Sequence, residues 1–146
     1  MRVFLFYYSM NFSESIKKTL SKVYVPIAWT LVIIILLALP GSVLPEEKGF
    51  KIPEFDKFVH FTLFGMMVFL WCFYFNSKKY RLKKLTVLFF LVFLFSNALG
   101  IGMEFIQRCC IPFRDYSEAD IIADMIGASI SYGICNIFLI GEKNAQ

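Results

Sequence analysis

The four cysteines of this 146-residue chain lack the CxxC spacing that zinc-binding motifs use. Cys109 and Cys110 are adjacent, whereas Cys72 and Cys135 lie far apart inside apolar runs. This pattern argues against a structural zinc site, and the two isolated cysteines are expected to behave as small apolar residues. No nucleophile motif and no recognised metal-ligand spacing occurs elsewhere, so the sequence predicts neither a cofactor nor a metal site.

Sustained alternation of polar and apolar residues is also lacking, which argues against the strands of a membrane barrel. Instead, hydrophobic residues make up 58% of the chain, more than the roughly 45–50% of soluble domains. The excess falls into four runs, each long enough to span a bilayer as a helix. These spans are expected at about 23–39, 58–75, 85–103 and 119–140. The sequence therefore predicts an all-α integral membrane protein, a four-helix up-and-down bundle that forms a single domain over residues 1–146.

Basic residues are distributed unevenly among the segments that flank these runs. They concentrate before the first run, at Lys17, Lys18 and Lys22, and between the second and third, at Lys78, Lys79, Arg81, Lys83 and Lys84. By the positive-inside rule, both termini and the second connection should be cytoplasmic, with the first and third connections outside. Because base-reading features are missing, no nucleic-acid partner is expected. Membrane lipids are the expected partners, and a homo-oligomer is compatible with this pattern.

The start of the chain and the first connection are less regular. Residues 1–10 (MRVFLFYYSM) are apolar but too short to span, and they have no small-residue cleavage site. We expect the first nine residues to be dispensable or interfacial, with Met10 as an alternative start. Turn signals follow the first run and predict an outer loop up to Pro53.

Charged and amide side chains gather at the ends of three runs. Asp56, Lys57 and His60 open the second run, Glu104 and Gln107 close the third, Arg114 lies in the next connection, and Asp120 and Asp124 open the fourth. In an antiparallel bundle these ends meet at one membrane surface, and ionisable groups within spans are functional candidates by default. Small residues that allow close helix approach accompany them, at Gly100, Gly102, Gly127, Ala128 and Ser131. The eight polar residues form the candidate site.

Local spacing predicts how some of these groups pair. Asp56 and His60 are one helical turn apart, so the carboxylate can accept a hydrogen bond from the imidazole or hold it protonated. Ser117 can cap the fourth helix, and Asp120 occupies the capping-box position three residues later. Asp124 lies one turn deeper and has no such local role, which makes it the stronger functional candidate of the two aspartates.

The order of these motifs resembles the VanZ-like membrane protein family. The resemblance rests on DKFVH at 56–60, EFIQ at 104–107, Arg114, and DIIADMIG at 120–127. It implies a small multi-pass protein of the bacterial cytoplasmic membrane, in a family whose founding member is associated with low-level resistance to the glycopeptide teicoplanin. The chain departs from the family at Asp124, where asparagine is usual. The added charge requires that Asp124 be protonated, or paired with Arg114 or His60.

Three functions are compatible with these residues. The first is a binding module that recognises a cell-envelope component, such as a lipid-linked or peptidyl precursor, with Arg114 pairing to Glu104 and Asp120. The alternative is an intramembrane enzyme acting on a lipid headgroup or phosphate ester, with His60 as acid or base and Glu104, Asp120 and Asp124 holding a divalent metal. An ion path would require polar groups through the whole membrane depth, whereas here they concentrate at one end.

Overall fold

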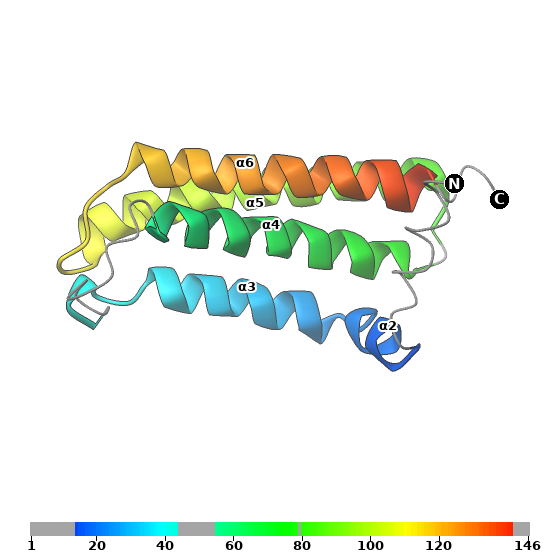
Figure 1. The fold of residues 1–146 in the computed structure, drawn as a ribbon, viewed down its shortest axis with the longest axis horizontal. Coiled ribbons are helices and arrows are strands. Elements are labelled where there is room, and N and C mark those ends of the chain that lie inside the picture. The colour runs from blue at the N-terminus through cyan, green and yellow to red at the C-terminus, as the bar shows by residue number, and fades with distance from the viewer. Residues whose placement is uncertain (1–13, 44–54, 79, 142–146) are drawn as a thin grey trace.

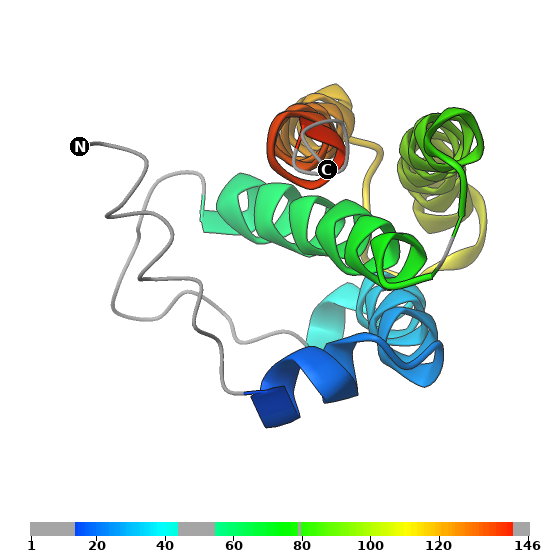
Figure 2. The same cartoon turned by 90° about the vertical axis from the view of Figure 1, so that its right-hand side faces the viewer.

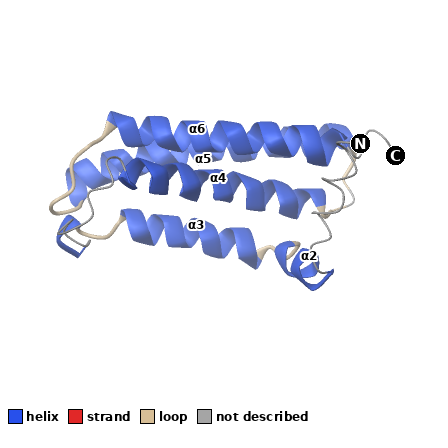
Figure 3. Ribbon diagram, in the orientation of Figure 1, coloured by secondary structure: helices blue, strands red, loops and turns tan. Residues whose placement is uncertain are grey.

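The computed structural model describes residues 14–43, 55–78 and 80–141, and all regular structure within them is helical (Figure 3). The helices are α2 (Glu14–Leu20), α3 (Tyr24–Leu37), α4 (Phe55–Asn76), α5 (Leu82–Cys110) and α6 (Glu118–Cys135). A short 3-10 turn, η1, covers Gly41–Val43, and α6 continues into a π-helical stretch, η2, over Asn136–Ile140. The all-α class is confirmed. The predictions for residues 1–10 and for the loop between 44 and 54 lie outside the described residues.

Three helices are long and apolar enough to cross a membrane, judged by length and composition. They are Phe55–Asn76, Leu82–Cys110 and Glu118–Ile140, with 22, 29 and 23 residues. The remaining predicted span, 23–39, corresponds to α3, which has only 14 residues and therefore a length of about 21 Å. Pro40 and Gly41 follow α3, and the residue before a proline disfavours helical backbone, so the helix ends before the apolar run does.

The helices α3, α4, α5 and α6 run alternately in opposite directions along the long axis of the molecule (Figure 1). Seen along that axis, α4 lies between α3 and α6, with α5 beside them (Figure 2). Among these helices α4 contacts all three others, and its most extensive partner is α6. This topology brings the start of α4, the end of α5 and the start of α6 to the same end of the molecule.

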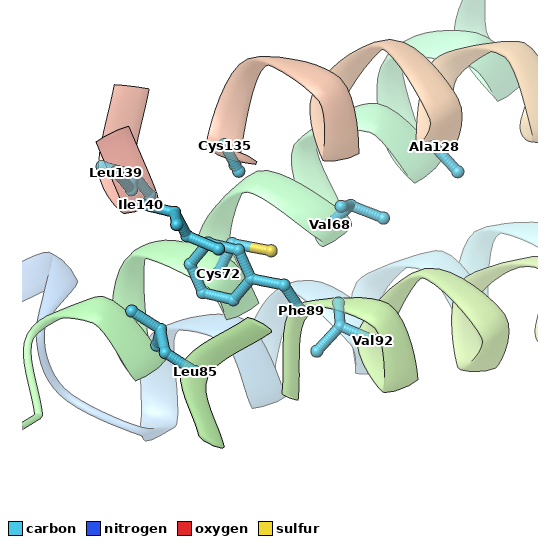
Figure 4. Close-up of a cluster of buried hydrophobic side chains, with 9 residues drawn as sticks. All are labelled: Val68, Cys72, Leu85, Phe89, Val92, Ala128, Cys135, Leu139 and Ile140. Atoms are coloured by element: carbon cyan, nitrogen blue, oxygen red, sulfur yellow. The ribbon is translucent and has the colours of Figure 1, made fainter. Parts of the chain in front are cut away.

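Two apolar clusters hold these helices together. The first lies between α4, α5 and the end of α6 (Figure 4), and its buried residues are Val68, Cys72, Leu85, Phe89, Val92, Ala128, Cys135, Leu139 and Ile140. The second joins α3 to α4 and α5 through Ile33, Leu37, Leu63, Phe64, Met67 and Met103. Cys72 and Cys135 are free thiols buried in the first cluster, which confirms that they act as small apolar packing residues.

Indole groups add polar links between α3 and α4. Nε1 of Trp29 donates to the carbonyl oxygen of Leu63 at 3.0 Å, and Nε1 of Trp71 donates to Oγ1 of Thr30 at 3.1 Å. A buried indole N–H needs such a partner, and these two bonds fix α3 against the central helix.

Large apolar side chains also cover the outward faces of the helices. Leu31 and Ile35 on α3, Phe90 and Phe95 on α5, and Ile126 on α6 are all exposed. Soluble monomers rarely expose extended apolar patches, whereas lipid tails cover such a surface without cost. The outer surface therefore supports the membrane location that the length of α4, α5 and α6 indicates.

Candidate functional site

Among the described residues, the buried ionisable and amide side chains gather at one end of the helices, whereas the buried hydroxyl of Ser96 lies in the middle of α5. His60 lies in the second turn of α4, Glu104 and Gln107 near the end of α5, and Asp120 and Asp124 in the first turns of α6. Each of these five is at most 7% exposed. Their burial and the helix directions (Figure 1) bring these five side chains together at the end of the molecule where the antiparallel arrangement predicts them.

The centre of the cluster is a contact between α4 and α6. Nδ1 of His60 lies 3.0 Å from Oδ1 of Asp124, and both side chains are only 2% exposed. The sequence suggested Asp56 for this role, but Asp56 begins α4 as an exposed residue and makes no hydrogen bond to His60. Asp124 takes it instead, which is one of the pairings that its extra charge required.

Glycines allow this contact to form. A Cβ atom at Gly127 would collide with the carbonyl oxygen of Phe61, the residue after His60, so α6 can approach α4 closely only with glycine there. A Cβ atom at Gly100 on α5 would lie 2.8 Å from Oδ2 of Asp124. The small residues at these two positions therefore determine where Asp124 sits, as well as how closely the helices pack.

A second contact joins the end of α5 to the start of α6. Ser117 is the N-cap of α6, and its Oγ accepts a hydrogen bond from the backbone N–H of Asp120 at 3.2 Å, as predicted. The reciprocal half of the capping box is not made by Asp120. Oε2 of Glu104 accepts from the backbone N–H of Ser117 at 3.0 Å instead. Because Glu104 satisfies this orphan amide, the Asp120 carboxylate is not needed for capping.

Gln107 has a structural contact. Its Nε2 donates to the carbonyl oxygen of Leu37 at 3.0 Å, and Leu37 is the last residue of α3. Carbonyl groups in the last turn of a helix have no intrahelical donor. Gln107 therefore fixes the end of α3 against α5, beside the cluster.

The two predicted basic members are less engaged. Arg114 lies in the connection between α5 and α6, and its buried Nε has no hydrogen-bond partner. Within the part of the chain that the structure describes, the expected ion pairs from Arg114 to Glu104 and Asp120 are not formed, because Glu104 is turned toward the α6 N-terminus. Lys57 is half-buried in the first turn of α4 and forms no ion pair with a described residue.

Two carboxylate oxygens of the cluster are buried without a partner: Oε1 of Glu104 and Oδ2 of Asp124. A further group of ligand-type atoms, one each from Asp56, His60 and Asp120, lies within 4.8 Å of one another. Unsatisfied buried polar atoms are rare in stable proteins, and unpaired buried charge is costly. The arrangement is therefore suited to bind a group that supplies donors or positive charge.

Sequence reasoning missed two contributors, Phe61 and Gly65. The backbone of Phe61 contacts Gly127, and a Cβ at Gly65 would lie 3.2 Å from the Gly127 carbonyl oxygen. The available signal was a lone glycine five residues after His60 in an otherwise bulky apolar run, which marks a close approach of another helix.

A related protein occurs in the fission yeast Schizosaccharomyces pombe, where it is described as an uncharacterized protein. It is 29% identical to this chain over 101 residues, which are 69% of this chain and 59% of the yeast protein. The chain thus matches less than two thirds of its relative's length. No family model and no solved structure matches the chain. The resemblance to the VanZ-like family accordingly stays a prediction.

Proposed function

We propose that this chain is a VanZ-like multi-pass membrane protein that binds the polar part of a membrane-embedded ligand in the buried cluster at one end of its helices. In this proposal α3 also crosses the bilayer, as the fourth helix of an up-and-down bundle. Its 14 residues are short for a span, and a short helix is accommodated when the bilayer thins or when flanking side chains such as Lys22 extend to the interface.

The basic residues support an orientation. Lys17 and Lys18 lie on α2, and Nζ of Lys78, after α4, donates to the carbonyl oxygen of Ser21 at 3.4 Å, so two basic segments meet at the end opposite the cluster. The positive-inside rule would place that end in the cytoplasm and the cluster on the outer side.

Cysteine labelling on intact cells tests this orientation. Cys109 is exposed at the cluster end, so a membrane-impermeant maleimide should label it from outside. A Ser77→Cys variant lacking Cys109 and Cys110 should stay unlabelled until the cells are opened. Labelling of Ser77→Cys in intact cells would reverse the proposed topology.

The observation that carries the binding proposal is the pair of unpartnered carboxylate oxygens on Glu104 and Asp124. A cluster that served only to hold helices together would be expected to satisfy its own members. The acidic balance of the cluster favours a ligand that offers amino, hydroxyl or amide donors, which both lipid headgroups and peptidyl envelope precursors carry. The resemblance to the bacterial VanZ-like family favours the envelope precursor. The fission yeast relative favours a lipid headgroup that occurs in both bacterial and fungal membranes.

The test compares Glu104→Gln with Glu118→Gln. Glutamine at 104 keeps an acceptor for the Ser117 amide but removes the charge, whereas Glu118 is an exposed acid in the first turn of α6 and serves as the matched control. We expect both variants to reach wild-type abundance in membranes. Only Glu104→Gln should lose lipids that co-purify with the protein, detected by mass spectrometry.

The link to drug resistance is tested in the same series. A bacterial host expressing the wild-type chain should tolerate more teicoplanin than a host expressing Glu104→Gln, with Glu118→Gln resembling the wild type. Equal lipid content and equal susceptibility for all three proteins, at equal abundance, would contradict the binding proposal. A drop in abundance of Glu104→Gln alone would instead indicate a structural cluster.

A second candidate function, an intramembrane enzyme, is favoured by the His60–Asp124 contact. A buried carboxylate at 3.0 Å from Nδ1 fixes the imidazole tautomer and leaves Nε2 to act as acid or base. The purified chain, incubated with phospholipid or undecaprenyl phosphate esters with and without divalent metal, should then release product, and His60→Ala should not. No turnover under any of these conditions would eliminate the enzyme.

A further inference from the structure

Three potential metal-ligand atoms lie close together at the exposed edge of the cluster, beside Asp56. Asp56 and His60 lie one turn apart on α4, and Asp120 comes from the first turn of α6. Each offers one ligand atom, and these atoms lie within 4.8 Å of one another. Zinc ligands lie about 2.0–2.2 Å from the ion, so a bound ion would draw the three only slightly together, and Asp56 is exposed and free to adjust.

A second observation comes from His60 itself. Its Nδ1 faces Oδ1 of Asp124 at 3.0 Å inside the protein, so Nε2 is the nitrogen left for a ligand. Metal-bound histidines almost always donate their other ring N–H to a carboxylate or carbonyl group, which fixes the ring and raises its basicity. Asp124 is therefore a positioning residue: it fixes the His60 ring in the way that an outer carboxylate fixes a metal-binding histidine.

A third observation is the excess of negative charge around this point. Oε1 of Glu104 is buried without a partner, and the side chain is 1% exposed. Its carboxylate is held at the α6 N-terminus by Ser117, and it interacts electrostatically with His60, Asp120 and Asp124. No lysine or arginine forms an ion pair with these carboxylates within residues 14–43, 55–78 and 80–141. A divalent cation would supply the missing positive charge.

We propose that Asp56, His60 and Asp120 bind one divalent transition-metal ion, Zn²⁺ or Mn²⁺, with Asp124 positioning His60. One imidazole nitrogen with carboxylate oxygens suits these ions, whereas Mg²⁺ and Ca²⁺ prefer oxygen ligands throughout. Three protein ligands leave coordination positions open, as in catalytic sites, and the exposed side of Asp56 gives access to them.

This inference deepens the proposed function, and rests on it only in identifying the outer ligand of the ion. A bound cation would reverse the local charge. The acidic cluster could then hold a phosphate or carboxylate oxygen of a headgroup, which its own side chains would repel. The donors of the same ligand would remain available to Glu104.

Metal retention by the purified full chain tests the proposal. The protein, in detergent and stripped with EDTA, is incubated with Zn²⁺, Mn²⁺ or Mg²⁺, passed over a desalting column and analysed by inductively coupled plasma mass spectrometry. We expect about one equivalent of Zn²⁺ or Mn²⁺ per chain and little Mg²⁺. The Asp56→Asn variant should not retain the metal. Because Asp56 is exposed, the helix content of this variant, measured by circular dichroism, should equal that of the wild type. Glu118→Gln should retain metal like the wild type.

The role of Asp124 requires a different readout. Asp124→Asn keeps an acceptor for His60 but removes the charge, and loss of such an outer carboxylate typically lowers metal affinity about 10–100-fold.

In the Co²⁺-loaded protein, the visible absorption of a site with a nitrogen ligand should appear in the wild type and change in His60→Gln. Equal retention by the wild type and Asp56→Asn, or a wild-type Co²⁺ spectrum like that of aqueous Co²⁺, would overturn the proposal. If the wild-type protein retains the metal but carries no co-purified lipid, the proposed ligand is wrong and the metal site stands.

Discussion

Replacing Gly127 by alanine should separate α6 from α4 and disturb the polar cluster at the same time. The added Cβ would overlap the carbonyl oxygen of Phe61, and neither backbone can move aside without shifting a helix. Gly127 is three residues after Asp124, and Phe61 directly follows His60. The shift that relieves the collision therefore also lengthens the contact between Nδ1 of His60 and Oδ1 of Asp124, now 3.0 Å.

The magnitude follows from comparison with a second glycine on the same helix. A Cβ at Gly133 would meet no heavy atom within 4 Å, so Gly133→Ala should be neutral or stabilise the helix by up to about 1 kcal/mol. Gly127→Ala gains the same propensity but incurs overpacking, which typically costs about 1–3 kcal/mol. We expect the two variants to differ by roughly that amount in free energy of unfolding.

Unfolding of both variants by increasing SDS in mixed micelles, followed by circular dichroism, measures this difference. The same samples, loaded with Zn²⁺, show whether the cluster is disturbed, because Gly127→Ala should retain less metal than Gly133→Ala at SDS concentrations where both are folded. If Gly127→Ala unfolds at the same SDS fraction as Gly133→Ala, α4 and α6 are not in the close contact on which the site depends, and the reasoning is refuted.

Two further substitutions test the supports of the cluster. Gly100→Ala places a Cβ 2.8 Å from Oδ2 of Asp124 and should lower the free energy of unfolding by about 1–3 kcal/mol, whereas Gly102→Ala, where nothing lies within 4 Å, should not; equal melting temperatures would contradict this. Gln107→Ala removes the donor to the Leu37 carbonyl oxygen and should cost about 1–3 kcal/mol, with faster hydrogen exchange at the end of α3, and unchanged exchange there would show that this bond does not hold α3.

Much of the fold could be predicted from local pattern. Apolar runs of membrane-spanning length appear in the sequence as they stand, and α4, α5 and α6 form over them. The boundary of α3 was the least accurate, because the apolar run continues to residue 39 while Pro40 ends the helix at Leu37. Hydropathy gives the length of the apolar run, but the backbone constraint of the proline determines where the helix ends.

The site shows the same division. The direction of successive helices follows from short connections, so the sequence by itself determined that His60, Glu104 and Asp120 lie at one end. Which of them touch could not be predicted from spacing. His60 has Asp56 one turn away on its own helix, yet its partner is Asp124, 64 positions along the chain.

The chain's own order of residues thus determined an all-helical, largely apolar protein with polar groups at one end, because hydropathy and helical periodicity act over a few turns. Only the tertiary structure decided that Asp124 is the partner of His60 and that Glu104 accepts the hydrogen bond from the backbone N–H of Ser117. Those contacts depend on how closely two helices approach and how they are rotated about their axes. Here the close approach is possible because Gly100 and Gly127 have no Cβ atom.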